Sequence, residues 1–121
     1  MILVAVDDLL FSSKIRATAK LVGVDLTFAR THDDILTQAG TLNPTLVIFD
    51  LDSQKTDPVT TIADLKRDPA LAAIRTLGFV SHVHTDRIAA ARQAGADDVL
   101  ARSQFASQLA DILQADRTVR P

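Results

Sequence analysis

Carboxylates follow two of the most apolar segments of the chain. Residues 46–49 are apolar without interruption and lead into Asp50, and residues 2–6 lead into Asp7 and Asp8. Continuous apolar runs rich in β-branched and aromatic residues predict strands that are buried on both faces. In a parallel α/β sheet, ligands bind at the carboxyl ends of central strands, so these acids are candidate functional groups. The alternative is that each acid only suits the turn that follows its strand.

Two other polar residues follow later strand-like segments. Ser81 comes after residues 76–80, and Arg102 comes after residues 98–101. Three carboxylates at close range raise one another's pKa, and a hard divalent cation such as Mg²⁺ relieves that repulsion. Acids, a metal ion, a hydroxyl group and a cation around one crevice suit phosphoryl transfer to a carboxylate nucleophile. An ordinary turn role for Ser81 and a plain ion pair for Arg102 are the alternatives.

Helical segments alternate with the predicted strands along the chain. The expected strands are residues 2–6, 24–29, 46–49, 76–80 and 98–101, and the expected helices are residues 11–22, 31–39, 58–67, 85–94 and 103–113. Gly23, Gly40 and Gly95 are the predicted helix stops, and Thr31 and Ser103 are predicted caps. This order predicts an α/β fold with a doubly wound, five-stranded parallel sheet and helices on both faces. The two strands that end in acids should be central neighbours, and strand 24–29 should lie at an edge.

Length and composition limit the class of protein. The 121 residues predict a single domain, 1–121, with a flexible tail over 115–121. Hydrophobic residues make up 47% and charged residues 23%, which is typical of soluble globular proteins, and the net charge of -2 gives no reason to expect nucleic-acid binding. The absence of Cys excludes disulfides and thiolate metal sites. The first apolar run is too short for a signal peptide or a membrane span, so we expect a cytoplasmic protein.

The pattern of these residues resembles the receiver domain of two-component response regulators, of the single-domain chemotaxis (CheY-like) type. The resemblance covers nearly the whole chain and is carried by Asp7 with Asp8, by Asp50, by Ser81 and by the Gly-Ala-Asp-Asp-Val-Leu string at residues 95–100. It implies a flavodoxin-like sheet of strand order 2-1-3-4-5. It also implies a signalling module that is switched when Asp50 accepts a phosphoryl group.

The resemblance further implies roles for the site residues. Asp8, Asp50 and the main-chain carbonyl of Asp52 would hold Mg²⁺, and Asp7 would assist through water. Ser81 would bind a phosphoryl oxygen and carry the switch, and Arg102 would supply the cation of the site. A histidine kinase or phosphotransfer protein would be the donor. A target protein would bind at the last two helices and the strand between them, with a homodimer as a further possibility.

The chain departs from the family pattern at several positions. Arg102 and Ser103 stand where the family has Lys and Pro, and His82 stands where a small residue usually leaves room above the acceptor. Ser53 and Gln54 replace a Met-Pro pair, Pro58 replaces a usual Gly, and Val99 replaces the switch aromatic. We expect His82 to slow both loading and loss of the phosphoryl group. We expect Arg102 to pair with Asp50 or Asp8 in the free protein.

Two other functions fit the same residues. A pseudo-receiver would keep the acidic pocket as an unphosphorylated interaction or dimerisation module. A small hydrolase would use Asp50 as a nucleophile, although a single small domain offers no evident general acid. In the favoured interpretation the protein is not an enzyme beyond Mg²⁺-dependent self-phosphorylation and dephosphorylation on Asp50. His82 and His84 are weak metal-site candidates, and His32 is expected to be simply solvated.

Overall fold

Five parallel strands form the centre of the molecule. The computed structural model describes residues 1–81 and 83–118, and side chains through residue 115. The strands are β1 (Ile2–Ala5), β2 (Leu26–Phe28), β3 (Leu46–Asp50), β4 (Arg75–Val80) and β5 (Asp98–Ala101). They form one sheet in the order β2-β1-β3-β4-β5. The predicted doubly wound α/β fold is therefore confirmed, with β1 and β3 as neighbours and β2 at an edge.

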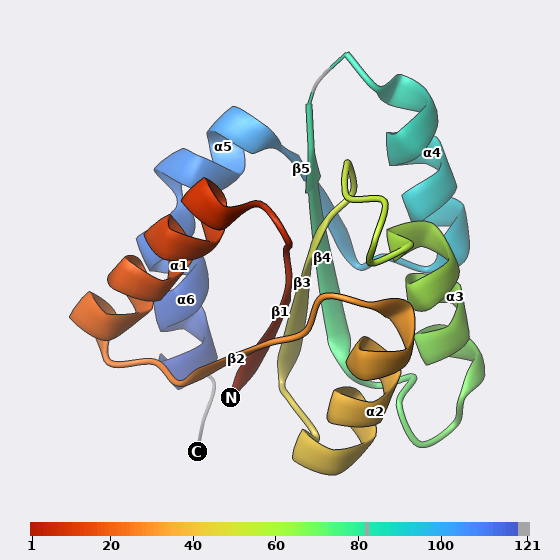
Figure 1. Cartoon of the computed structure of the whole chain (residues 1–121), viewed down its shortest axis with the longest axis horizontal. Coiled ribbons are helices and arrows are strands. Elements are labelled where there is room, and N and C mark those ends of the chain that lie inside the picture. Colours follow the sequence, from red (N-terminus) through yellow and green to blue (C-terminus); the bar gives the residue numbers. More distant parts are fainter. Residues whose placement is uncertain (82, 119–121) are drawn as a thin grey trace.

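Helices cover both faces of this sheet, as Figure 1 shows. One face carries α1 (Leu9–Val22), α5 (Arg102–Ser107) and α6 (Leu109–Thr118), and the other carries α2 (His32–Leu42), α3 (Pro58–Arg67) and α4 (Thr85–Ala94). Alternate residues of the central strands enter two apolar cores, so that Val47 and Phe49 pack on one side and Leu46 and Ile48 on the other. Every residue of β1 and β3 is buried, as their uninterrupted apolar sequences predict. None of the helices in the described ranges has the length and hydropathy that crossing a membrane requires.

The strand register brings the carboxyl ends of four strands to one edge of the sheet. Ala5 of β1 pairs with Phe49 of β3, and Asp50 pairs with Phe79 of β4. The residues that follow these strands therefore gather at this edge. The strand order reverses between β1 and β3, and ligands of doubly wound sheets typically bind at the carboxyl ends of the strands beside such a reversal.

The predicted end of the second helix is wrong. Gly40 does not end α2; the helix continues to Leu42, and Asn43 ends it in the left-handed region at φ 48°, with its N–H donating to the Ala39 carbonyl. Nothing contacts the position of a Gly40 side chain. The stop comes from Pro44, which disfavours a helical conformation in the residue before it.

The final helix also differs from its prediction. Ser103 does not cap it; α5 begins at Arg102, and Gln108 separates α5 from α6. Residues 115–118, for which the sequence showed no helical pattern, continue α6, and the flexibility predicted for 115–121 stays a prediction. No Gly or Pro occurs between the start of α6 and Pro121, and Ala115 is a strong helix former, so no local signal ends the helix earlier. Residues 119–121 of the predicted tail lie outside the described residues.

Candidate functional site

Asp50 is the last residue of β3, and its side chain is only 5% exposed. Its Oδ1 accepts a hydrogen bond of 2.9 Å from the Asp52 N–H and lies 3.4 Å from Arg102 Nη2. Burial raises the pKa of Asp50. The Asp52 N–H and Arg102 partly oppose that rise, and the charges of Asp52 and Asp7 add to it. The result is a desolvated, well-oriented carboxylate at the edge where ligands bind in this type of sheet.

The two acids that follow β1 are placed differently from each other. Asp8 is the N-cap of α1, where its Oδ1 accepts a hydrogen bond of 3.1 Å from the Phe11 N–H, and its Oδ2 lies 4.0 Å from Arg102 Nη1. Asp7 interacts with Asp50 through its charge. Both acids therefore belong to the same electrostatic cluster as Asp50.

The acidic side chains at this edge offer hard oxygen donors of the kind that bind divalent metal ions. Among the described side chains, those of residues 1–81 and 83–115, no group of three or more His, Cys, Asp or Glu is arranged to hold a metal ion. The ligand set that the resemblance implies, two carboxylates and a main-chain carbonyl with Asp7 acting through water, does not need such a group. The hard oxygen donors do suit Mg²⁺, which is typically bound by one or two carboxylates and several waters. A site built from Asp8, Asp50 and the Asp52 carbonyl stays a prediction.

The side chain of Asp52 is the most connected group of the site. Its Oδ2 accepts a hydrogen bond of 3.2 Å from the Ser81 N–H and lies 3.4 Å from Arg102 Nη2. Its Oδ1 lies 2.8 Å from His84 Nδ1 and accepts a hydrogen bond from Arg87 Nη1. This carboxylate therefore connects the loop after β3 to the end of β4, to α4 and to α5.

The environments of Asp50 and Asp52 move their pKa values in opposite directions. Burial raises the pKa of Asp52, but hydrogen bonds from the Ser81 N–H, Arg87, His84 and Arg102 outweigh burial and lower it overall. The pKa of Asp50 is raised. Asp52 is consequently the fixed anion of the pair, and Asp50 is the more basic carboxylate.

Arg102 is held between the acids and an aromatic cluster. Its guanidinium carbon lies 5.3 Å from the ring centroids of both Phe11 and Phe79, within the range of cation–π attraction. Phe79 in turn stacks on Phe105, with centroids 4.4 Å apart. The ion pair between Arg102 and Asp50 that the sequence predicts is present at 3.4 Å. The rings orient the guanidinium so that one nitrogen faces both Asp50 and Asp52.

An open cavity adjoins this cation. It has a volume of about 420 Å³ and is lined by Phe11, Ser81, Arg102, Ser103 and Ala106. Ser81, predicted to bind a phosphoryl oxygen, therefore does lie beside Arg102, and that role stays a prediction. Ser103, expected only as a cap, also faces the cavity. The predicted effect of His82 falls on a residue outside the described ranges.

Three parts of the site were missed by reasoning from the sequence: the Asp52 side chain, His84 and Arg87. His84 occupies the N-cap position of α4 without capping it, and Arg87 lies three residues later. A basic pair at this spacing can face one partner from the first turn of a helix. That partner is more than thirty residues away in the sequence, so the pattern alone does not identify it.

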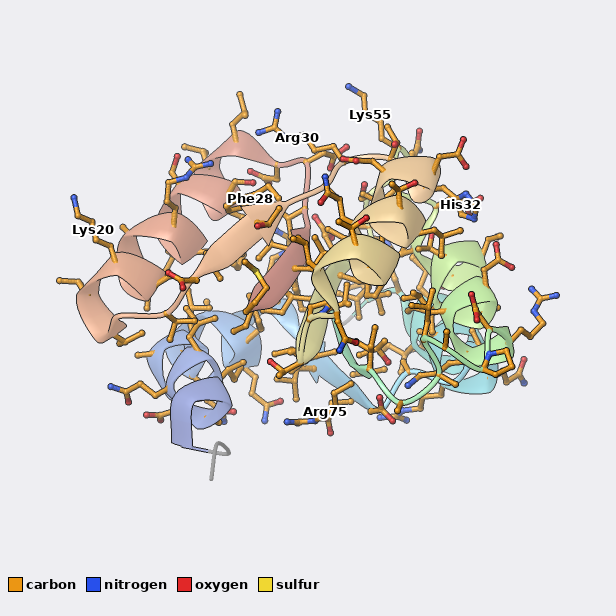
Figure 2. The ribbon with its side chains drawn as sticks, turned by 90° about the horizontal axis from the view of Figure 1, so that it is seen from below. Lys20, Phe28, Arg30, His32, Lys55 and Arg75 are labelled. Atoms are coloured by element: carbon orange, nitrogen blue, oxygen red, sulfur yellow. The ribbon has the colours of Figure 1, made fainter. Side chains whose placement is uncertain are left out.

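His32 forms a separate polar cluster and is not simply solvated, contrary to expectation. Its Nε2 lies 2.7 Å from Asp64 Oδ2 and its Nδ1 lies 3.0 Å from Asp33 Oδ1. Figure 2 shows His32 at the start of α2, on the side where α3 lies. The hydrogen bond to Asp64 is the main cause of a raised pKa for His32. The residue joins α2 to α3 rather than serving the acidic site.

The chain matches no protein-family model, and no curated protein matches it with significance. Response regulators are among the solved structures of similar shape. The response regulator from Hahella chejuensis has a TM-score of 0.84 at 20% identity, covering 98% of this chain and 95% of that one. The receiver domain of NtrX from Brucella abortus has a TM-score of 0.81 at 17% identity, covering 99% and 100%.

A third similar structure is the Mn²⁺-bound form of the response regulator Rcp1. It has a TM-score of 0.72 at 20% identity, covering 98% of this chain and 91% of that one. At these identities the comparisons establish the fold. The chain has the flavodoxin-like fold of response regulator receiver domains, with the strand order 2-1-3-4-5 that the resemblance implied.

Proposed function

We propose that this chain is a phosphorylation-switched receiver domain that accepts a phosphoryl group on Asp50. The observation that carries the proposal is the placement of Asp50. This buried carboxylate ends the central strand β3 and lies 3.4 Å from the guanidinium of Arg102, which lines an open cavity together with Ser81. A nucleophile beside a cation and an open space is the arrangement that phosphoryl transfer needs.

The chemical step requires little from the protein beyond positioning. An ionised oxygen of Asp50 attacks the phosphorus of a phosphohistidine on a kinase or phosphotransfer protein. The P–O bond of an acyl phosphate forms as the P–N bond breaks, and the electron pair of that bond stays on the imidazole nitrogen. Arg102 can donate hydrogen bonds to the transferred oxygens, and the Ser81 hydroxyl can donate another. Mg²⁺ bound at Asp8, Asp50 and the Asp52 carbonyl, with Asp7 acting through water, would supply further neutralisation of charge.

The partners follow from the same proposal. The donor is a histidine kinase or phosphotransfer protein in the cytoplasm. The output is the binding of a target protein to the surface formed by α4, β5 and the final helices. The same surface could also form a homodimer. Asp52 contacts His84 and Arg87 at the start of α4, which connects the acceptor loop to this surface. The protein has no enzymatic role on other substrates in this proposal.

The test is phosphorylation by a small donor. Incubation with acetyl phosphate and Mg²⁺ should add one phosphoryl group by intact mass, and Asp50→Asn should abolish the addition. Asp57→Asn is the matched control, because Asp57 is an exposed acid of the same loop whose side chain makes no capping hydrogen bond. The control should be phosphorylated like the wild type. Absence of any addition with acetyl phosphate and with kinase donors would contradict the proposal.

A pseudo-receiver is the second candidate, and one observation favours it. Arg102 already pairs with both Asp50 and Asp52. A guanidinium can thus neutralise the site without a metal ion. Unchanged hydrogen exchange at the acidic loop during Mg²⁺ titration, together with no phosphorylation, would support this candidate.

A further inference from the structure

We propose that Asp52 is a built-in competitor of the phosphoryl group. In the unmodified protein its carboxylate holds the Ser81 N–H and Arg102, and phosphorylation of Asp50 has to displace it. The inference rests on the proposed function and adds the device by which the site is regulated.

The competition follows from shared donors. Asp52 Oδ2 accepts from the Ser81 N–H at 3.2 Å and lies 3.4 Å from Arg102 Nη2. The same Nη2 lies 3.4 Å from Asp50 Oδ1. A phosphoryl group on Asp50 brings about two negative charges and three acceptor oxygens to this nitrogen. It is therefore the stronger acceptor and draws Arg102 away from Asp52.

The second oxygen of Asp52 faces α4. Its Oδ1 contacts His84 at the N-cap position and Arg87 in the first turn of that helix. One carboxylate thus bridges the donors of the phosphoryl site and the start of α4. A change in the position of Asp52 is transmitted directly to His84 and Arg87.

Helix α4 packs beside α3 but contributes few fully buried side chains to the core. Ala91 is its buried residue, while Ile88 and Ala94 pack only partly buried against the core. Segments with few buried apolar contacts open at low free-energy cost. Displacement of Asp52 should therefore loosen the first turn of α4 before any other helix responds. The device couples occupancy of the phosphoryl site to the surface proposed for target binding.

The experiment uses Asp52→Asn, which keeps the shape of the side chain and removes its charge. Beryllofluoride with Mg²⁺ is the phosphoryl probe, and its affinity is measured by calorimetry. We expect about 10-fold tighter binding in Asp52→Asn, the effect of about 1.4 kcal/mol, and less than about 2-fold change in the control Asp57→Asn. Asp52→Ala provides a second variant without an amide group if Asp52→Asn is not folded.

Hydrogen exchange provides a second readout, and its first comparison is made without ligand. Hydrogen exchange over residues 84–94 should be faster in unliganded Asp52→Asn than in the wild type. Beryllofluoride should produce the same acceleration in the wild type and little further change in the variant. A purely local role of Asp52 would change exchange in its own loop and leave α4 unaffected, which would overturn the inference.

The outcomes separate the two proposals. Equal or weaker binding in Asp52→Asn, with clear binding in the wild type, overturns the competition and leaves the receiver function intact. Binding of beryllofluoride by the variant alone supports the competition, because the Asp52 carboxylate then prevents binding in the wild type by occupying the shared donors. Binding by neither protein overturns the receiver function and the competition with it.

Discussion

Leu51 packs against Gly78 so closely that a Cβ atom on Gly78 would lie 2.9 Å from Leu51 Cγ. Leu51 stands between the two central carboxylates in the sequence, and its N–H donates a hydrogen bond of 2.9 Å to the Phe79 carbonyl. The side chain of Leu51 is buried. Because Gly78 has no side chain, Leu51 can occupy this space, and its position in turn fixes the position of the loop between Asp50 and Asp52.

Gly78→Ala should displace this loop. We expect a loss of about 1–3 kcal/mol in the free energy of unfolding, because extra volume in a packed core forces neighbouring groups to shift. Phosphorylation by acetyl phosphate should also slow. The matched control is Gly40→Ala in α2, where nothing lies within 4 Å of the added atom. It should be neutral or stabilising by about 0.5–1 kcal/mol in urea denaturation. Equal stabilities of Gly78→Ala and the wild type would show that Leu51 moves without cost.

Arg102→Ala should uncouple the site from α4 more than it reduces phosphorylation. The variant removes the cation that Asp50 and Asp52 share. We expect phosphorylation by acetyl phosphate to persist within about 10-fold of the wild-type rate, while beryllofluoride no longer changes exchange over residues 84–94. Arg102→Lys should be tolerated without improvement, since Lys keeps the charge but loses the forked hydrogen bonds.

The control for this experiment is Arg16→Ala. Arg16 also stacks over an aromatic ring, that of Phe28 at 4.7 Å, and does so on α1 and β2. It should change neither phosphorylation nor exchange in α4. If Arg102→Ala behaves like the control, Arg102 has no part in the response and the proposed role fails.

Asp50→Asn should stabilise the protein at neutral pH. Burial raises the folded-state pKa of Asp50 above its ordinary value of 3.8, so the folded protein binds this proton more tightly than the unfolded chain. Ionised Asp50 therefore reduces stability above its folded pKa, and this reduction disappears as pH falls below 3.8. The variant should exceed the wild type in free energy of unfolding at neutral pH, and the difference should shrink in acid. A variant less stable than the wild type at neutral pH would mean that the Arg102 pair outweighs desolvation.

His32 should stabilise the fold only when it is protonated. The hydrogen bond to Asp64 raises its pKa from 6.5 in the folded state. Its contribution is complete below that value and is lost as pH rises through the folded pKa. His32→Gln should cost about 0.5–1 kcal/mol at a pH of about 5.5 and less at about 8.5, as measured by urea unfolding. Asp64→Asn should remove the same pH dependence, and a pH-independent cost of His32→Gln would contradict the ion pair.

Local sequence was sufficient for the architecture. The uninterrupted apolar runs at β1 and β3 determined two doubly buried central strands, and alternation with helices determined the parallel sheet. Gly23 and Gly95 end their helices in the left-handed region, as predicted, since glycine adopts it without steric cost. Helix ends that depend on weaker signals, at Gly40 and Ser103, were predicted wrongly. Capping is a local preference that neighbouring residues can override.

The acidic edge was partly determined by the sequence as well. The sequence predicts that Asp50 and Arg102 lie near each other, because each follows a strand and parallel strands end at the same edge of the sheet. The role of Asp52 was decided only by the tertiary structure. Its contacts with Ser81, His84 and Arg87 join segments separated by about thirty residues. No local periodicity encodes such a contact, since it depends on how the loop after β3 and the start of α4 are packed around the same carboxylate.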